Sequence, residues 1–257
     1  MKFARIWLGA WVILAFVSPF LFRAYAVETH VDVALTGPSL AHLCGTDSLG
    51  RDLFFRILLG SSVSLGVSAG AVLLTLFLGA WLGAIAGYFG GVREKFILGM
   101  IDLFLCFPAF FLILAVIAVL GSSVWNLVWV LAVTSWMGVA RLVRAEVLSL
   151  KEREFIWAAK ALGAGSFRII SKHLIPNSMA PLRVAAVLAL SSAILTEAGL
   201  SFLGIGVQPP TPSWGNLLME GKSTLGAAWW VMFFPGTAVF LTVFSLNTLG
   251  ESFNRGK

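Results

Sequence analysis

Six long apolar stretches constrain this chain more than any other feature of its sequence. Each is close to the length of about 20 residues that a helix needs to cross the hydrocarbon core of a bilayer. They occupy residues 6–22, 62–87, 96–120, 124–140, 182–204 and 228–249. Because backbone groups cannot form hydrogen bonds to lipid, these stretches must be helical. We therefore predict an all-α integral membrane fold, with six transmembrane helices in one domain covering residues 1–257.

The charge of the chain supports this fold class. Hydrophobic residues make up 59% of the sequence and charged residues only 12%, about half the charged share of a soluble domain. The net charge is +6, but the basic residues are spread over the ends of the apolar stretches and do not gather on a soluble face. The charge is therefore a topology signal, with membrane lipids as partners, and does not indicate nucleic-acid binding.

The basic residues also predict an orientation, since Lys and Arg are retained on the cytoplasmic side of short loops. With the N-terminus inside, fourteen of the eighteen Lys and Arg residues fall on cytoplasmic segments. The four on the other side are Arg23, Arg51, Arg56 and Lys222. We expect both termini to be cytoplasmic.

The N-terminal stretch has the elements of a secretory signal. Lys2 and Arg5 precede the apolar run, and residues 24–26 offer a small-x-small cleavage site. The run is long for a signal peptide, however, and Arg23 lies directly before the site. We expect a retained span.

A basic loop, residues 141–181, separates the fourth and fifth stretches and carries seven of the eighteen Lys and Arg residues. Phe155, Ala159 and Leu162 follow one another at helical spacing, which predicts a short helix over residues 153–162 with one apolar stripe. Gly163 then ends this helix. Such a stripe on a charged loop indicates a site where a soluble partner docks, while the alternative is a loop held on anionic lipid.

A second short helix is predicted directly after the first. Ser166 is its expected N-cap, and Phe167, Ile170 and Leu174 share one face. Pro176 is expected to stop it. The loop is therefore predicted to be a helix-turn-helix at the membrane surface.

Glycines in the second stretch predict close helix packing. Gly79, Gly83 and Gly87 are spaced four residues apart, and Gly66 and Gly70 precede them with the same spacing. Small residues at this spacing let two membrane helices approach closely. The sequence leaves open whether the partner helix is in the same subunit or another.

Two acids, Asp102 and Glu197, fall in or near the membrane. Ionisable groups at this depth are expensive and raise the hypothesis of an ion or proton relay. Neither has a second acid or a histidine at relay spacing within its stretch. We favour structural hydrogen bonding for both.

The longest outside segment, residues 23–61, ends in a motif rich in glycine and charge. Asp52 and Arg56 have the i, i+4 spacing of a helical ion pair. Two interpretations are open, an interfacial helix at the headgroups and part of an outer gate or receptor-docking surface. The motif residues are Gly45, Thr46, Asp47, Gly50, Arg51 and Asp52.

Catalytic and metal chemistry have little support in the sequence. The three histidines, His30, His42 and His173, are scattered over two loops and form no catalytic cluster. Cys44 and Cys106 lie in different environments, which argues against a disulfide or a cysteine metal site. The chain has no phosphate-binding loop of the G-x-x-x-x-G-K-[ST] type, so we expect it neither to bind nor to hydrolyse ATP.

The basic loop resembles the EAA loop of ABC-importer permeases. Ala158-Ala159, then Gly163 after three residues, then Pro176 at the end of the segment match that pattern, with Trp157 in place of its Glu. The segments HLCGTDSLGRDLFFRILLGSSVSLGV, AGYFGG and EAGLSFLGIGVQPPTPSWGNLL are similar to the oligopeptide, dipeptide and nickel permease group. Within that group, the chain resembles the type of subunit that pairs with a second, distinct permease.

The resemblance implies a non-catalytic permease subunit in the bacterial cytoplasmic membrane that forms half of a translocation pathway. Its implied partners are a second permease subunit, two ATP-binding subunits and an extracytoplasmic solute-binding protein, and ATP and magnesium are held by the ATP-binding subunits. Peptide is the expected cargo, nickel or a metal chelate the alternative, and a secondary transporter the more remote one. The residues expected to couple the chain to the ATPase are Arg153, Glu154, Phe155, Ala158, Ala159, Lys160, Leu162, Gly163 and Pro176.

Overall fold

A computed structural model describes residues 2–255, with side chains described as far as Phe253, so Lys257 of the orientation argument lies outside the described residues. Helices dominate this part of the chain, and its only β-type pairing is an isolated bridge between Thr46 and Asp52. The elements are α1 (Lys2–Leu21), α2 (Arg23–Val27), η1 (Val31–Val33), α3 (Leu53–Phe89), α4 (Gly91–Leu105), α5 (Ala109–Leu120), α6 (Val124–Leu150), α7 (Glu154–Ala161), α8 (Ser166–Ile169), η2 (Ile170–Leu174), α9 (Ile175–Asn177), α10 (Met179–Phe202), α11 (Trp214–Thr224) and α12 (Trp230–Arg255).

Five of these helices are long and apolar enough to cross a membrane, namely α1, α3, α6, α10 and α12. The sixth predicted span, residues 96–120, consists instead of α4 and α5, which are bent by 88° at a short break. Pro108 lies in this break, immediately before α5. A proline has no N–H group to give to the preceding turn, and here the helix breaks completely.

Helix α3 begins earlier than predicted. It runs without interruption for 37 residues from Leu53, and its first two turns are largely buried, including Leu53, Arg56 and Ile57. The interpretation of this segment as a separate interfacial helix is therefore wrong. Helix propensity continues through residues 53–61 because the segment contains neither proline nor an interrupting turn.

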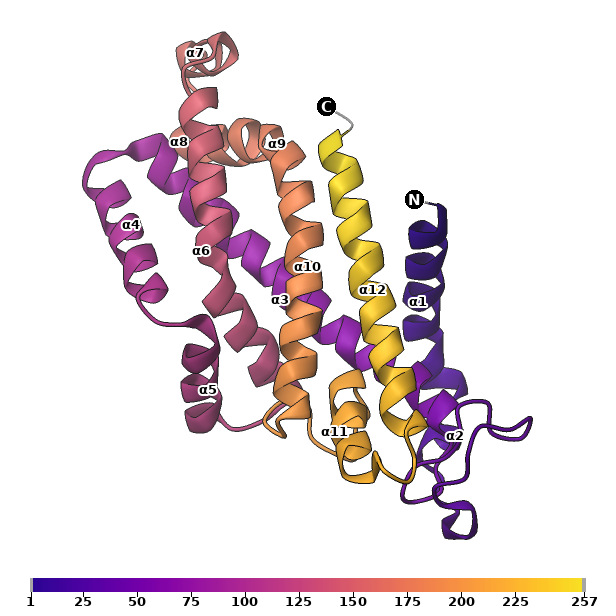
Figure 1. Ribbon diagram of the computed structural model, residues 1–257. Coiled ribbons are helices and arrows are strands. Elements are labelled where there is room, and N and C mark those ends of the chain that lie inside the picture. Colours follow the sequence, from indigo (N-terminus) through magenta and orange to yellow (C-terminus); the bar gives the residue numbers. More distant parts are fainter. Residues whose placement is uncertain (1, 256–257) are drawn as a thin grey trace. The chain divides into compact units, whose positions relative to one another are not determined.

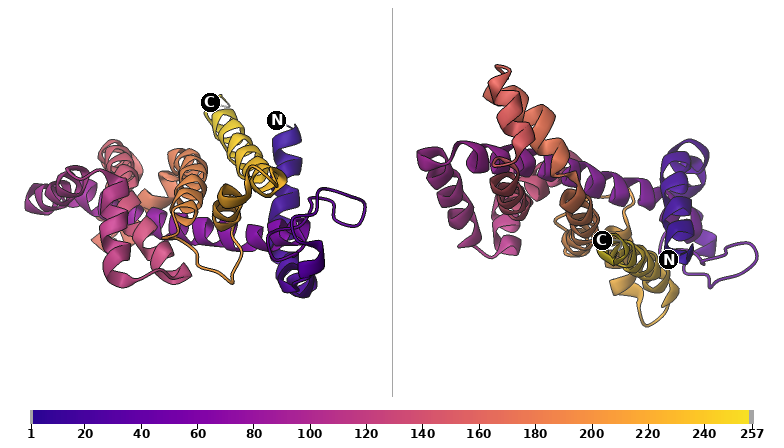
Figure 2. Two further views of the ribbon diagram at one scale, coloured as in Figure 1. Left: turned by 60° about the horizontal axis from the view of Figure 1, so that its bottom comes forward. Right: turned by 90° about the horizontal axis from the view of Figure 1, so that it is seen from above.

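The chain divides into two compact units, and the division passes through α3, α5, α6 and α10. Unit 1 comprises residues 1–70, 117–128 and 187–257, and unit 2 comprises residues 71–116 and 129–186. In unit 1, α1 and α12 lie side by side and antiparallel, so both ends of the chain are at one end of this unit, with α11 at the other (Figures 1 and 2).

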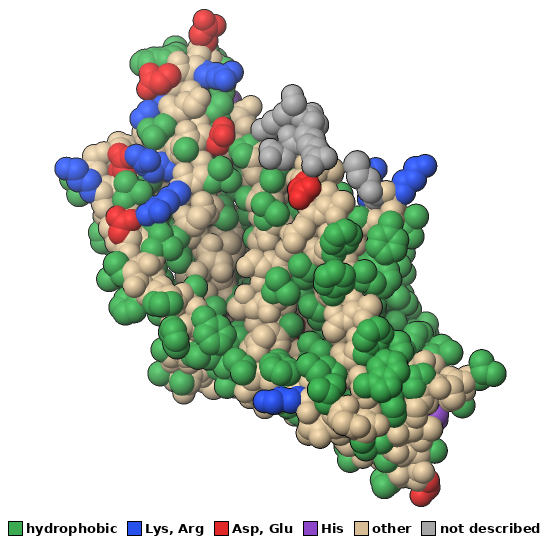
Figure 3. All heavy atoms as spheres, viewed as in Figure 1, with side chains coloured by type: hydrophobic (Ala, Val, Ile, Leu, Met, Phe, Trp, Pro, Cys, Tyr) green, Lys and Arg blue, Asp and Glu red, His purple; other side chains and the backbone are tan. Residues whose placement is uncertain are grey.

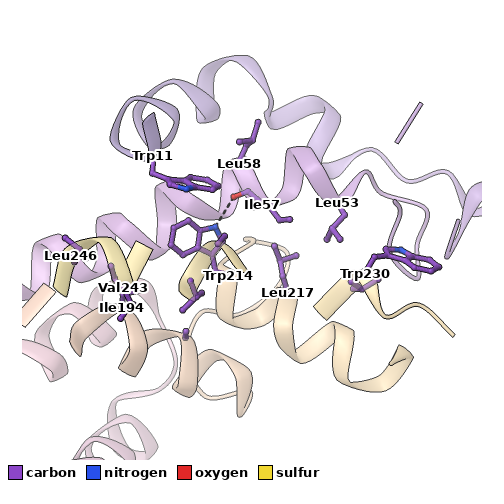
Figure 4. Packing of buried hydrophobic residues seen from close by; sticks show 14 of the residues in the cluster. Trp11, Leu53, Ile57, Leu58, Ile194, Trp214, Leu217, Trp230, Val243 and Leu246 are labelled. Carbon is purple, nitrogen blue, oxygen red and sulfur yellow. Dashed lines mark hydrogen bonds between the residues drawn. The ribbon is translucent and has the colours of Figure 1, made fainter. Parts of the chain in front are cut away.

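Indole rings dominate the core of unit 1. Trp214 is completely buried, and its ring meets that of Trp11 edge-on, with 5.0 Å between centroids. The Trp214 Nε1–H group donates a hydrogen bond of 3.1 Å to the carbonyl oxygen of Ile57 (Figure 4). This core joins α1, α3 and α11 through one large side chain, and Leu217 adds a second buried contact from α11.

In unit 2, α3 and α6 pack with their backbones in close approach. A Cβ atom at Gly79 would lie 2.6 Å from the Cβ of Val139, and one at Gly83 would overlap the carbonyl oxygen of Ala140. Gly87 faces α6 in the same way, whereas Gly66 has open space around it. The partner helix of the predicted glycine series is thus α6 of the same chain.

Candidate functional site

The basic loop is held on unit 2 by apolar side chains that point inward from its short helices. Ile156 of α7 is completely buried, and Ile169, Ile170 and Leu174 are buried with it. These four belong to one cluster with residues of α3, α6 and α10. The loop therefore rests on a packed core, which is the condition for it to transmit a displacement to the membrane helices.

Helix α7 covers residues Glu154–Ala161, close to the predicted range, and begins directly after Arg153. Its C-terminus forms a Schellman motif. The Gly163 N–H group donates to the Lys160 carbonyl at 2.9 Å and the Ala164 N–H group to that of Ala159 at 3.0 Å. Gly163 has φ +80°, a conformation that glycine adopts without steric cost. The end of the helix is fixed by backbone geometry.

The side chains predicted to dock lie on the outward side of α7. Leu162 is 88% exposed, and Phe155 and Trp157 are exposed as well. Lys160 is held over the Trp157 ring, with 4.9 Å from Nζ to the centroid, and over that of Tyr88 at the end of α3. Of the remaining predicted residues, Arg153, Glu154 and Ala158 are exposed and Ala159 is half-buried. Figure 3 shows basic and acidic side chains interspersed over this end of unit 2.

The second helix of the loop differs from its prediction. Its N-cap is Gly165, not Ser166, and no side chain caps it. Pro176 does not stop it either. The chain passes through a π-helical turn, η2, in which the Ile175 N–H group donates to the Ile170 carbonyl, and Pro176 then lies at the start of α9, where its missing N–H group is not needed.

The wider turn also changes which side chains share a face. Ile170 and Leu174 are buried together, but Phe167 is 72% exposed and Ile169 is buried in its place. The Phe167 ring stacks on Trp81 of α3, with 5.5 Å between centroids. The predicted single stripe of Phe167, Ile170 and Leu174 is therefore wrong at its first member.

The motif of residues 45–52 and the start of α3 form a buried ion cluster around Asp47 and Arg56. Asp47 is completely buried and accepts hydrogen bonds from Arg51 Nε at 2.7 Å and Arg56 Nη1 at 2.5 Å. Arg56 also binds Glu220 of α11 through both terminal nitrogens, and Arg51 Nη2 lies 3.3 Å from the same carboxylate. The cluster ties the motif to α11.

Asp52 does not pair with Arg56 as predicted. It precedes the first residue of α3, and its Oδ1 accepts from the Phe54 N–H group at 2.9 Å, the role of a helix N-cap. Its Oδ2 lies 2.8 Å from His42 Nδ1. Because the Asp52 carboxylate caps the first turn of α3, it is not placed to pair with Arg56.

The other motif residues close the turn before α3. Thr46 is buried and its carbonyl oxygen accepts from Trp230 Nε1 at 3.2 Å. Gly45 lies against the same indole, and Gly50 packs on the backbone of His30 so closely that a Cβ atom would overlap it. Burial, and then the charge of Asp52, raise the pKa of the neighbouring Cys44 thiol to about 11. That thiol therefore stays protonated at neutral pH and is a poor nucleophile.

The two membrane acids have different surroundings. Asp102 is exposed on α4, and its Oδ1 lies 2.6 Å from Arg141 Nη2 on α6. Glu197 is completely buried on α10, and its Oε1 accepts from Ser201 Oγ at 2.8 Å. Both carboxyl groups take part in hydrogen bonds. Within the described residues, no group of three or more His, Cys, Asp or Glu side chains is placed to hold a metal ion.

Sequence reasoning missed Ile156 and Glu220. Ile156 lies between two members of the predicted outward stripe, so its inward direction follows once α7 is known to rest on a core. The sequence does contain a feature that could have identified Glu220, because it is the only acid in residues 198–250. An isolated acid in an apolar stretch calls for a cation, and Arg51 and Arg56 are two of the four cations on the predicted outer side.

The comparison with known sequence families decides between the interpretations. Residues 79–256 match the family described as "Binding-protein-dependent transport system inner membrane component". The chain belongs to this family. It is therefore a multi-pass membrane subunit of an ABC transporter, as predicted, and the importer interpretation is preferred to a secondary transporter.

Relatives of this transport component are similar over nearly the whole chain. The dipeptide transport system permease protein DppC of Alkalihalophilus pseudofirmus is 41% identical over 94% of this chain and 80% of the relative. The glutathione transport system permease protein GsiD of Pectobacterium atrosepticum is 39% identical over 93% of this chain and 80% of its own length. The dipeptide transport system permease protein DppC of Bacillus subtilis is 37% identical over 93% of this chain and 75% of its own length.

Solved structures support the all-helical permease fold. A chain of the inward-facing MetNI methionine ABC transporter superposes with a TM-score of 0.62 and 17% identity, covering 79% of this chain and 97% of that one. A chain from the crystal structure of an amino acid ABC transporter with histidines superposes with a TM-score of 0.57 and 15% sequence identity. The match covers 79% of this chain and 94% of that one. At this identity the likeness concerns the fold alone.

Proposed function

We propose that this chain is one of the two membrane subunits of an ATP-driven peptide importer and that α7 is its coupling element to the ATPase. The observation that carries the coupling role is the two-sided character of α7, with Ile156 buried and Leu162 exposed. A helix that is anchored in the core on one side and exposes apolar side chains on the other is suited to insert into a groove of a soluble partner.

Dipeptides or other short peptides are the proposed cargo. The relatives named above are permeases of dipeptide and glutathione transport systems, and glutathione is itself a small peptide. These names favour peptide over the nickel or metal-chelate alternative. A solute-binding protein on the outer side would deliver the cargo, as the family description implies.

The proposed assembly contains a second, distinct permease and two ATP-binding subunits. ATP and magnesium are then held by the ATP-binding subunits, and this chain contributes conformational change without catalysis. Both termini are proposed to be cytoplasmic, on the side of α7. Fourteen of the eighteen basic residues fall on that side under this orientation, which agrees with the retention of Lys and Arg in the cytoplasm.

Charge introduced on the outer side of α7 tests the coupling role. F155E and L162E are expected to reduce dipeptide uptake by about tenfold or more, because a charge forced into an apolar contact costs at least about 1.4 kcal/mol. The measurement is uptake of labelled dipeptide and ATP hydrolysis by the reconstituted complex, with nickel uptake measured in parallel.

The matched control is V92E, which places the same charge on an apolar residue of unit 2 outside α7 that is about as exposed as Leu162. It should leave uptake within about twofold of wild type. Unchanged uptake in F155E and L162E would contradict the coupling role and favour a loop that is held on anionic lipid. Uptake of nickel without dipeptide would contradict the proposed cargo.

A further inference from the structure

Glu197 occupies a buried polar site in unit 1 that the transport role described so far does not use. The side chain is completely buried, although it lies only about one and a half turns from the end of α10. Ser201 Oγ donates to its Oε1 at 2.8 Å. Its other oxygen, Oε2, has no hydrogen-bond partner among the described residues. A buried carboxyl oxygen in this state calls for a donor.

Three serines from three segments lie in this part of unit 1. Besides Ser201 of α10, they are Ser64 on α3 and Ser213 before α11, which the Trp214–Ser64 hydrogen bond and the packing of Gly215 on Ala198 bring to this turn of α10. Each of the three hydroxyl oxygens also accepts a hydrogen bond from a backbone N–H group. These bonds are Val207 N–H to Ser201 at 3.0 Å, Trp214 N–H to Ser64 at 3.0 Å and Asn216 N–H to Ser213 at 3.2 Å.

This pattern leaves each serine with its single O–H proton available for Glu197. A hydroxyl has one donor proton and two acceptor lone pairs, and the backbone N–H groups occupy acceptor positions only. A carboxyl group is the side chain that can accept from several hydroxyls at once. The three serines thus connect one central acceptor to the backbone of Val207, Trp214 and Asn216.

The surrounding backbone is packed too tightly for another group to take this place. A Cβ atom at Gly215 would lie 2.6 Å from the carbonyl oxygen of Ala198, and one at Gly206 would overlap the Ser201 hydroxyl. Directly beyond the serines, Trp214 fills the core and binds Ile57 of α3 (Figure 4). The first turn of α11 is therefore in contact with both α3 and α10.

We propose that Glu197 is a positioning residue, which holds residues 203–213 and the first turn of α11 on α3 and α10 as the shared acceptor of Ser64, Ser201 and Ser213. Further along α11, the partly buried Glu220 binds Arg56 of α3, so carboxyl groups hold both halves of this helix. Where this inference concerns uptake, it rests on the proposed function, in which α11 lies on the outer side that meets the solute-binding protein.

Amide hydrogen exchange in the assembled transporter tests the proposal directly. E197Q keeps the size of the side chain but replaces an acceptor oxygen by an NH₂ donor, which cannot accept from a hydroxyl. We expect the amides of Val207, Trp214 and Asn216 to exchange about tenfold faster or more. T196A is the matched control, because Thr196 is the neighbouring residue and bonds only to its own helix, at Ser192. It should leave the three amides unchanged.

Uptake kinetics supply a readout that a general loss of stability would not give. For E197Q we expect the concentration of loaded binding protein at half-maximal uptake to rise several-fold, while the maximal rate changes by less than about twofold. A lower maximal rate with an unchanged half-saturating concentration would overturn the positioning role. Exchange of the three amides within twofold of wild type would overturn it too, whatever the uptake result.

Single serine variants keep the proposal testable if E197Q does not assemble. S64A should speed hydrogen exchange at the amide of Trp214, with a much smaller effect at Asn216. S213A should speed exchange at the amide of Asn216, with a much smaller effect at Trp214. Uniform deprotection by both variants, or none, would contradict a site made of separate serine connections. If wild-type complex carries no peptide, the proposed function fails, but the exchange results still decide the role of Glu197.

Discussion

Carboxylate–guanidinium pairs occur in both units, but at opposite degrees of burial. In unit 1, Arg56 has only 3% of its side chain exposed and meets Asp47 and Glu220, of which Asp47 is completely buried. In unit 2, Arg141 is 50% exposed and its partner Asp102 66%. The chemical groups are the same, so the difference in their energetic role comes from the solvent around them.

Burial decides how much stability is lost when one member of an ion pair is removed. A buried charge that loses its partner remains uncompensated in a medium of low dielectric constant, whereas an exposed one is rehydrated. The unit 1 cluster therefore acts as a fixed joint between residues 47–56 and α11. The unit 2 pairs join α4 to α6 by contacts that can break and re-form at low cost. One Arg→Met substitution, made at three degrees of burial, measures this difference.

The largest effect is expected for R56M. Among the described residues, it leaves the buried Asp47 and the partly buried Glu220 with Arg51 as their remaining guanidinium contact. This should lower the free energy of unfolding by about 3–5 kcal/mol. The measurement is chemical or thermal unfolding of the detergent-solubilised chain. K222M, which removes an exposed cation from the same helix as Glu220, is the control. A cost below about 1 kcal/mol for R56M would show that the cluster is not a joint.

An intermediate effect is expected for R144M. Arg144 is 30% exposed, and its Nε donates to Glu94 Oε1 at 2.7 Å. Losing hydrogen bonds to a charged partner at half-burial should cost about 1–2 kcal/mol in the same unfolding assay. K95M on α4 removes a nearby exposed cation and should be nearly neutral. If R144M costs as much as R56M, burial is not the variable that separates the two units.

The smallest effect is expected for R141M. Its exposed pair with Asp102 should contribute about 0–1 kcal/mol, and the difference from wild type should shrink further as salt is added. Unfolding at low and high salt checks this expectation. A cost that is large and insensitive to salt would mean that Asp102 and Arg141 are covered in the assembled transporter.

Local patterns predicted the bounds of α7 well because the determinants of this helix are local. The spacing of Phe155, Ala159 and Leu162 gave a helix within a residue of α7, and Gly163 ended it through a motif that depends on one residue's backbone freedom. The prediction for the second helix was wrong by one residue at its N-cap, and it was wrong at Pro176 because a π-helical turn precedes that proline. Such a turn forms when tertiary packing of Ile170 and Leu174 outweighs local preference.

The hydrogen-bond partners of the polar side chains could not be predicted from the sequence, for a different reason. Asp52 with Arg56 was the pair that spacing suggested, yet Asp52 caps α3, and Arg56 binds Glu220, 164 residues away in sequence. The sites around Glu197 and Glu220 each combine segments distant along the chain. Sequence spacing carries information about neighbours on one helix, but none about which helices meet.

Taken by itself, the sequence determined the membrane class, the all-helical fold, the position of the basic loop and its likeness to importer permeases. These follow from hydrophobic length, the distribution of cations and short motifs, all of which act over a few turns of helix or less. Tertiary structure alone decided the break at Pro108, the burial of Ile156 and the partners of Asp47 and Glu197. Burial and hydrogen-bond partners depend on which surfaces are brought together, and only the packed chain specifies that.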